Sequence, residues 1–142
     1  MDLNELTLDV DQEIDIKAPI PEVFQSLLRR LSSEQVLPDG KEFPMVLEQE
    51  PGGRWYRALG DGSGHLWGLV QVIKPPTLLE FTGPMFMSYP ASGHIAFRLT
   101  EIEGGTRLAL RHRVVGMIDP EHRQGVVPGW QCLLDDMKSR CE

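Results

Sequence analysis

From Leu8 to Ile16 the side chains alternate between two chemical kinds. The even positions are apolar, with Gln12 as the one polar exception, and every odd position is an acid. Successive side chains of a β-strand point to opposite faces, so this period of two predicts a strand with one buried and one solvated face. Such a strand needs partner strands and a covering layer, which restricts the chain to folds that contain a sheet.

Further strand-like segments follow, separated by residues typical of turns. Glu103-Gly104-Gly105 lies between two of them, a pattern typical of a β-hairpin. The short connections between successive segments predict an antiparallel meander. The predicted strands cover residues 8–16, 43–50, 54–59, 65–74, 78–82, 93–102 and 106–115.

Helical spacing of apolar residues predicts a helix over 20–31. Arg29 and Arg30 lie off its apolar stripe, near the C-terminal end, where cations suit the helix dipole. A short second helix is predicted around Ser33–Val36.

The last predicted helix starts at Asp119, an N-cap residue followed by a proline in the first turn. Gly125 and Pro128-Gly129 are expected to kink or divide it near its start. Its apolar stripe consists of Trp130, Leu133, Leu134 and Met137.

Length and charge narrow the function classes. The 142 residues fit a single domain, 1–142. A formal charge of −7 argues against binding to nucleic acid or anionic membranes. No run of about 18 apolar residues could span a membrane, and the acidic N-terminus does not look like a signal peptide. Cys132 and Cys141 would lie about 13 Å apart on the last helix, too far for a disulfide, so we expect free thiols and a cytoplasmic location.

The predicted fold class is α+β. A curved antiparallel sheet of six to seven strands wraps around a long C-terminal helix, with one or two short helices after the first strand. A curved sheet that wraps around one helix tends to leave a hollow between the two layers.

The element order and the residues at its joints resemble the SRPBCC (START/birch-pollen-allergen-like) superfamily, and within it the branch named after the activator of the heat-shock-protein-ninety ATPase. The resemblance covers nearly the whole chain, and its individual motifs are short. The matching residues are Ile16-Lys17-Ala18-Pro19, Val23-Phe24, Gly53, Trp67-Gly68-Leu69-Val70, Pro75-Pro76, Leu79, Phe81, Phe97, Leu99, Gly105-Thr106-Arg107-Leu108, His112 and Gly129-Trp130.

This resemblance implies a helix-grip fold whose cavity binds apolar small molecules or lipids. Some relatives are cyclases or aromatase-like enzymes, and the name-giving branch binds a chaperone. A shared fold does not establish a shared activity.

A cavity wall can be predicted from strand alternation and from the soft Met85–Tyr89 segment. The alternative is that the same residues fill a dry core. The predicted cavity residues are Trp67, Phe81, Met85, Met87, Tyr89, Phe97, Leu110, His112, Trp130 and Leu134.

His112 is the polar residue of greatest interest, because alternation turns it inward beside Leu110. An inward imidazole could hydrogen-bond a ligand or act as a general base. It could equally be a core histidine satisfied by a neighbouring group. No other catalytic residue is proposed.

Other site chemistries find little support. The four histidines are scattered, without the spacing of a metal site, and no metal or other cofactor is expected. The glycine-rich loop 60–64 precedes a strand, whereas a phosphate loop precedes a helix, so it is interpreted as a turn.

An arginine stripe is predicted on the outer face of the sheet, formed by Arg98, Arg107, Arg111 and Arg113. It could dock an acidic protein partner, or it could be an ordinary solvated face. The leading hypothesis is therefore binding of an apolar or lipid-like small molecule. One alternative is a protein-interaction module, either a chaperone cofactor or a partner of a regulator, that uses the arginine stripe. The other is a cyclase- or hydratase-like enzyme with His112 as the base.

Overall fold

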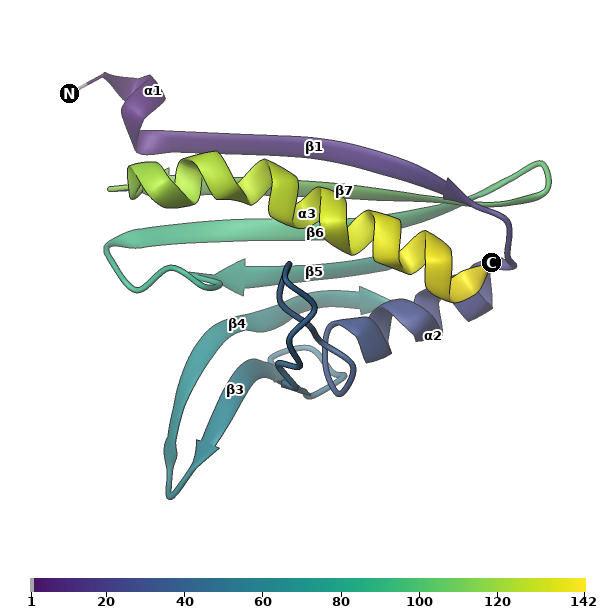
Figure 1. Ribbon diagram of the computed structural model, residues 1–142, viewed down its shortest axis with the longest axis horizontal. Helices are drawn as coiled ribbons and strands as arrows, with labels where there is room; N and C mark the ends of the chain where they lie inside the picture. The colour runs from purple at the N-terminus through teal and green to yellow at the C-terminus, as the bar shows by residue number, and fades with distance from the viewer. Residues whose placement is uncertain (1) are drawn as a thin grey trace.

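The computed structural model describes residues 2–142, which form a curved sheet covered on one face by helices (Figure 1). The helices are α1 (Leu3–Leu6), α2 (Ile20–Arg30) and α3 (Pro120–Cys141). The strands are β1 (Thr7–Ile16), β2 (Val46–Leu47), β3 (Arg54–Gly60), β4 (Ser63–Lys74), β5 (Leu78–Gly83), β6 (Ala91–Ile102) and β7 (Gly105–Gly116).

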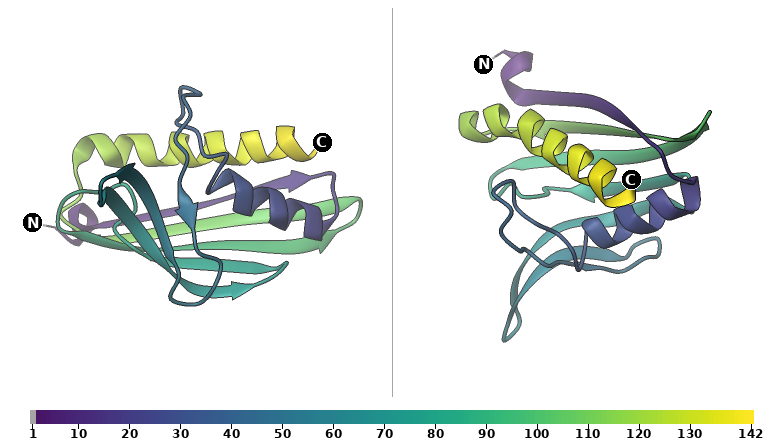
Figure 2. Two further views of the ribbon diagram at one scale, coloured as in Figure 1. Left: turned by 90° about the horizontal axis from the view of Figure 1, so that it is seen from below. Right: turned by 45° about the vertical axis from the view of Figure 1, so that its right-hand side comes forward.

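All strand pairs are antiparallel, and the seven strands lie in the order β1-β7-β6-β5-β4-β3-β2. The meander from β2 to β7 follows the chain, and β1 closes it by pairing along β7, from Thr7 opposite Val115 to Ile16 opposite Thr106. Figure 2 shows α2 and α3 on the same side of the curved sheet. The predicted α+β helix-grip architecture, with its antiparallel sheet and C-terminal helix, is confirmed.

The alternation in β1 gives the predicted two faces, with Val10 and Ile16 buried and all four acids exposed. Gln12 also points inward, and there its Nε2 donates to the carbonyl oxygen of Val127 on α3 at 3.1 Å. The polar exception in the strand therefore bonds to the residue that precedes the proline inside α3.

The segment between α2 and β3 differs from the prediction. Residues 33–36 form no helix, because the turn that follows α2 ends at residue 34 and Val36 makes an isolated β-bridge with Glu42. Strand structure within 43–50 is limited to β2. Pro44 has no N–H to give to a ladder, which limits strand pairing there. The backbone of the segment instead bonds to itself, because Phe43 N donates to the carbonyl of Gln35 at 2.8 Å and Met45 N to that of Ser32 at 2.9 Å.

The two ends of the chain also differ from the prediction. Residues Leu3–Leu6, placed in no element by the sequence pattern, form a short helix capped by the Asp2 side chain. Helix α3 is capped by Asp119 as predicted, but Pro128 lies inside it and does not divide it. A single missing N–H leaves the neighbouring turns bonded, and burial of the apolar stripe holds the helix together on both sides.

The core lies between the sheet and the two long helices. Val23, Phe24 and Leu27 of α2 are fully buried, as are Leu134 and Met137 of α3. Trp55 of β3 is also fully buried, and its Nε1 donates to the carbonyl oxygen of Leu31 at 2.7 Å. This bond ties the far side of the sheet to the end of α2.

Substituting Trp55→Phe should lower the free energy of unfolding by about 1–3 kcal/mol, because a buried hydrogen bond and part of a ring are lost. Trp67→Phe is the matched control, since the buried Trp67 Nε1 has no partner within residues 2–142. Urea unfolding of both variants should show the larger loss for Trp55→Phe. Equal losses would contradict a stabilising role for the bond to Leu31.

Candidate functional site

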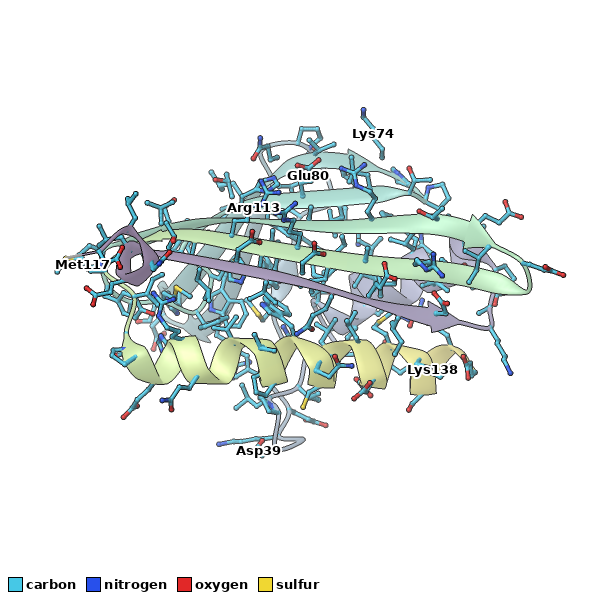
Figure 3. All side chains as sticks on the ribbon, turned by 90° about the horizontal axis from the view of Figure 1, so that it is seen from above. Asp39, Lys74, Glu80, Arg113, Met117 and Lys138 are labelled. Carbon is cyan, nitrogen blue, oxygen red and sulfur yellow. The ribbon has the colours of Figure 1, made fainter. Side chains whose placement is uncertain are left out.

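A pocket of about 430 Å³ opens beside α3, on the side of the irregular segment 31–45. Figure 3 shows that segment extending past α3, with Asp39 at its tip. The lining follows α3 from Glu121 to Leu133, about 18 Å along the axis, so the pocket is elongated. It is lined by Arg30, Gln35, Val36, Leu37, Pro38, Phe43, His65, Trp67, Phe86, Glu121, His122, Gly125, Val126, Gly129, Trp130, Cys132 and Leu133.

Aromatic rings form much of the wall. Trp67 lies 6.0 Å from Phe43 and 5.9 Å from Phe86, measured between ring centroids, and Phe86 lies 5.6 Å from His122. Phe43 is held from outside by Arg57, whose guanidinium lies 4.3 Å from the ring centroid and whose Nη1 donates to Pro44. Flat, apolar walls of this kind are typical of small-molecule sites.

Two glycines keep the helical wall open. Gly125 and Gly129 both line the pocket, and a Cβ built on either of them would meet no atom within 4 Å. Glycine inside a helix costs about 1 kcal/mol relative to alanine, and Pro128 lies beside one of them. Packing does not require these glycines, so their effect is the space that they leave.

One end of the pocket carries a buried cation. Arg30 is only 4% exposed, and its Nε lies 2.6 Å from Asp136 Oδ2 on α3. Its Nη1 donates to Gln35 Oε1. Burial lowers the pKa of Arg30, while the neighbouring Asp136 carboxylate opposes that shift. The prediction placed Arg30 off the buried stripe; the structure corrects this, because Arg30 lies one full heptad after the buried Val23 and shares its side of α2.

The other end is held by a tyrosine and a histidine. The Tyr89 hydroxyl lies 2.7 Å from His122 Nδ1, and the two rings stack at 5.3 Å. Burial raises the pKa of Tyr89. This contact fixes the first turn of α3 against the loop between β5 and β6.

His112 lies behind the wall and not in it. It is fully buried, and its Nδ1 accepts a 3.1 Å hydrogen bond from Trp130 Nε1. That bond assigns the proton of the neutral ring to Nε2, which is sealed without a partner within residues 2–142. Burial and, to a lesser extent, His94 lower the pKa of His112 to about 4. No lone pair of this imidazole is free to act as a base toward the pocket.

The predicted cavity residues fall into three groups. Trp67 and Trp130 line the pocket. Tyr89 and His112 stand one layer behind, bonded to the lining residues His122 and Trp130. The closed core contains the others, which do not line this pocket: Phe81, Met85, Met87, Phe97, Leu110 and Leu134.

The backbone explains why Phe86 replaces its neighbours in the wall. Met85 adopts a left-handed conformation with φ 58, and Met85 and Met87 are both buried in the core. Phe86 between them faces the pocket. The alternation of side chains in the sequence does not reveal a single left-handed residue, because glycine is the residue type that usually indicates this conformation.

The arginine stripe lies on the outer face and is largely ion-paired within the protein. Arg107 Nε lies 2.8 Å from Asp15 Oδ1, and Arg111 Nη2 lies 2.9 Å from Asp9 Oδ2. Arg113, labelled in Figure 3, also approaches Asp9, at 3.9 Å, and Arg98 is exposed on β6.

Within residues 2–142, no three His, Cys, Asp or Glu side chains gather as a metal site requires. None of the helices in that range has the length and hydrophobicity of a membrane-spanning segment.

The depressed pKa of His112 predicts a loss of stability in weak acid. An ordinary histidine titrates near 6.5, so between about pH 6.5 and 4 the unfolded chain takes up a proton that the folded protein does not. The free energy of unfolding should therefore fall by about 3 kcal/mol as the pH drops through this window. The free energy of unfolding of the wild type and of His112→Gln can be measured by denaturant titration at several pH values and expressed relative to the value of each protein at pH 8. It should fall much less with decreasing pH in His112→Gln than in the wild type. Parallel curves would mean that His112 is not the group responsible.

The family model described as "Activator of Hsp90 ATPase homolog 1-like protein" matches residues 17–142. No curated protein matches the chain. Among solved structures, an uncharacterized protein from Rhizobium leguminosarum is similar, with TM-score 0.69 and 20% identity over 93% of this chain and 92% of that one.

Two other structures share the fold. Protein CV1439 from Chromobacterium violaceum has TM-score 0.71 and 18% identity over 94% of this chain and 96% of that chain. The di-domain ARO/CYC StfQ from the steffimycin biosynthetic pathway has TM-score 0.69 and 14% identity over 98% of this chain and 52% of that chain, so this chain spans about half its length. At these identities the likeness concerns the fold. The family model covers most of the sequence, and the protein therefore belongs to the activator of Hsp90 ATPase homolog 1-like family, within the SRPBCC superfamily.

Proposed function

We propose that the protein binds an apolar small molecule, lipid-like or aromatic, in the elongated pocket beside α3. The observation that carries the proposal is the pair of glycines, Gly125 and Gly129. They weaken a helix at positions where alanine would fit, and the space that they leave belongs to the pocket.

The rest of the pocket supports the same function. Its volume of about 430 Å³ is within the range of roughly 300–1,000 Å³ that is usual for small-molecule sites. Trp67 and Trp130, each more than nine-tenths buried, present aromatic surface to it. The likeness to an aromatase/cyclase domain makes planar aromatic molecules one class of ligand to test. His112 lacks a free lone pair toward the pocket, which favours binding over base catalysis.

A free cysteine in the pocket wall can report whether the pocket is occupied. Cys132 is exposed and lines the pocket, whereas Cys141 is half-buried and does not. Both are free thiols, which supports the proposal of a cytoplasmic location.

Binding can be tested with N-phenyl-1-naphthylamine, an uncharged probe that fluoresces in apolar surroundings. We expect saturable binding to the wild type, together with slower modification of Cys132 by a thiol reagent when the probe is bound. Cys141, followed by mass spectrometry in the same sample, serves as the internal control. Absence of saturable binding would contradict the proposed function.

A larger side chain on α3 that fills the pocket should have opposite effects on stability and on ligand binding. Gly129→Leu should raise the free energy of unfolding by about 0.5–1 kcal/mol, because leucine is a better helix former, and it should weaken probe binding at least tenfold. Gln124→Leu, at an exposed position of the same helix outside the pocket, should leave binding unchanged. If Gly129→Leu binds the probe as well as the wild type does, the probe occupies another place.

A further inference from the structure

Arg30 lies where it could bind a ligand as well as stabilise the fold. Its side chain is 5% exposed, yet it lines the pocket together with Gln35. A buried guanidinium is costly unless its donors are satisfied. Nε bonds to Asp136 and Nη1 to Gln35, whereas Nη2 donates no hydrogen bond within residues 2–142. Nη2 is also not fully enclosed by the described part of the chain. Its N–H groups therefore remain as donors for an occupant of the pocket.

The ionic surroundings leave this end of the pocket positive. Asp136 is shared, because it lies 2.6 Å from Arg30 and 2.8 Å from Arg140. Glu34 is shared in the same way between Arg140, at 2.7 Å, and Arg29, at 3.2 Å. The connected network contains three arginines and two carboxylates, which leaves one positive charge on a protein whose overall charge is −7.

The rest of the pocket has a different character. From Arg30 the lining continues along α3 past Leu133, Trp130 and Val126, which are apolar. The nearest acid in the lining, Glu121, belongs to the first turn of α3, about 18 Å of helix from Leu133. The pocket thus has a positive end followed by a long apolar body.

We propose that the natural ligand is a carboxylate with an apolar body, whose carboxylate accepts hydrogen bonds from Arg30 Nη2 while the body lies along α3 between Trp130 and Phe86. This inference rests on the proposed function and adds the chemistry of the head group. Gln35 and Asp136 act as positioning residues, because they hold the guanidinium through its other nitrogens.

A matched pair of competitors tests the head group without any mutation. Dodecanoic acid and dodecan-1-ol, which differ only at the head, are each used to displace N-phenyl-1-naphthylamine from the wild type at pH 7.5. A charge-assisted hydrogen bond should make the acid at least about tenfold more effective. If both displace the probe equally, the head-group inference is overturned and the proposed function stands. If the probe itself does not bind, the proposed function has failed first.

Two variants locate the effect. Arg30→Met should abolish the preference for the acid while it retains binding of the alcohol, and Asp136 keeps Arg140 as a partner in that variant. Arg98→Met removes the same charge from an exposed position on β6, outside both the pocket and this ionic network, and it should keep the preference. Thermal unfolding of both variants checks that they are folded. A preference that survives Arg30→Met would assign the head group to another residue and refute the inference.

Discussion

The concave face of the sheet is wider than the helices that cover it, and this mismatch governs the rest of the structure. Seven strands about 4.8 Å apart span about 29 Å, whereas one helix is about 10 Å across. α3 contacts β1, and α2 contacts β6, β7 and α3. The β3–β5 side of the face must therefore be covered by the irregular segment 31–45 and by large side chains. The pocket lies where that cover meets α3, because residues of both segments line it.

The lining side chains are positioned by polar contacts hidden behind them. His112 holds the Trp130 indole, Tyr89 holds the His122 ring, and Asp136 holds the Arg30 guanidinium. In each case a residue that does not line the pocket bonds to one that does. Such bonds are strengthened by the low dielectric of the interior and restrict the rotamers of the wall. A wall that is already ordered costs a ligand less conformational entropy on binding.

Regular patterning was sufficient to predict the fold. The alternation in β1, the turn at Gly104 and the cap at Asp119 are local signals, and each corresponds to an observed element. The same signals failed wherever neighbours in space decide the outcome. Residues 33–36 form no helix, because the segment bonds to itself and sends the Gln35 side chain to Arg30.

The candidate site was harder to predict, because its lining depends on irregular backbone. A left-handed Met85 turns Phe86 into the pocket, and no pattern in the sequence reveals that conformation. Two features of the sequence do relate to the site, although the sequence alone favours another interpretation of each. Arg30 follows Val23 by one heptad and so shares its buried side, and the glycines of α3 predicted a break in the helix although their effect is to leave space.

The acids of β1 have a consequence beyond this molecule. β1 is an edge of the sheet and is ten residues long, and an exposed edge of that length can pair with the same edge of another copy. Antiparallel pairing centred on Gln12 would place Asp11 opposite Glu13 and Asp9 opposite Asp15 of the second copy. Like charges directly opposite each other oppose pairing. The alternation that builds the strand therefore also discourages two copies of the protein from pairing through this edge.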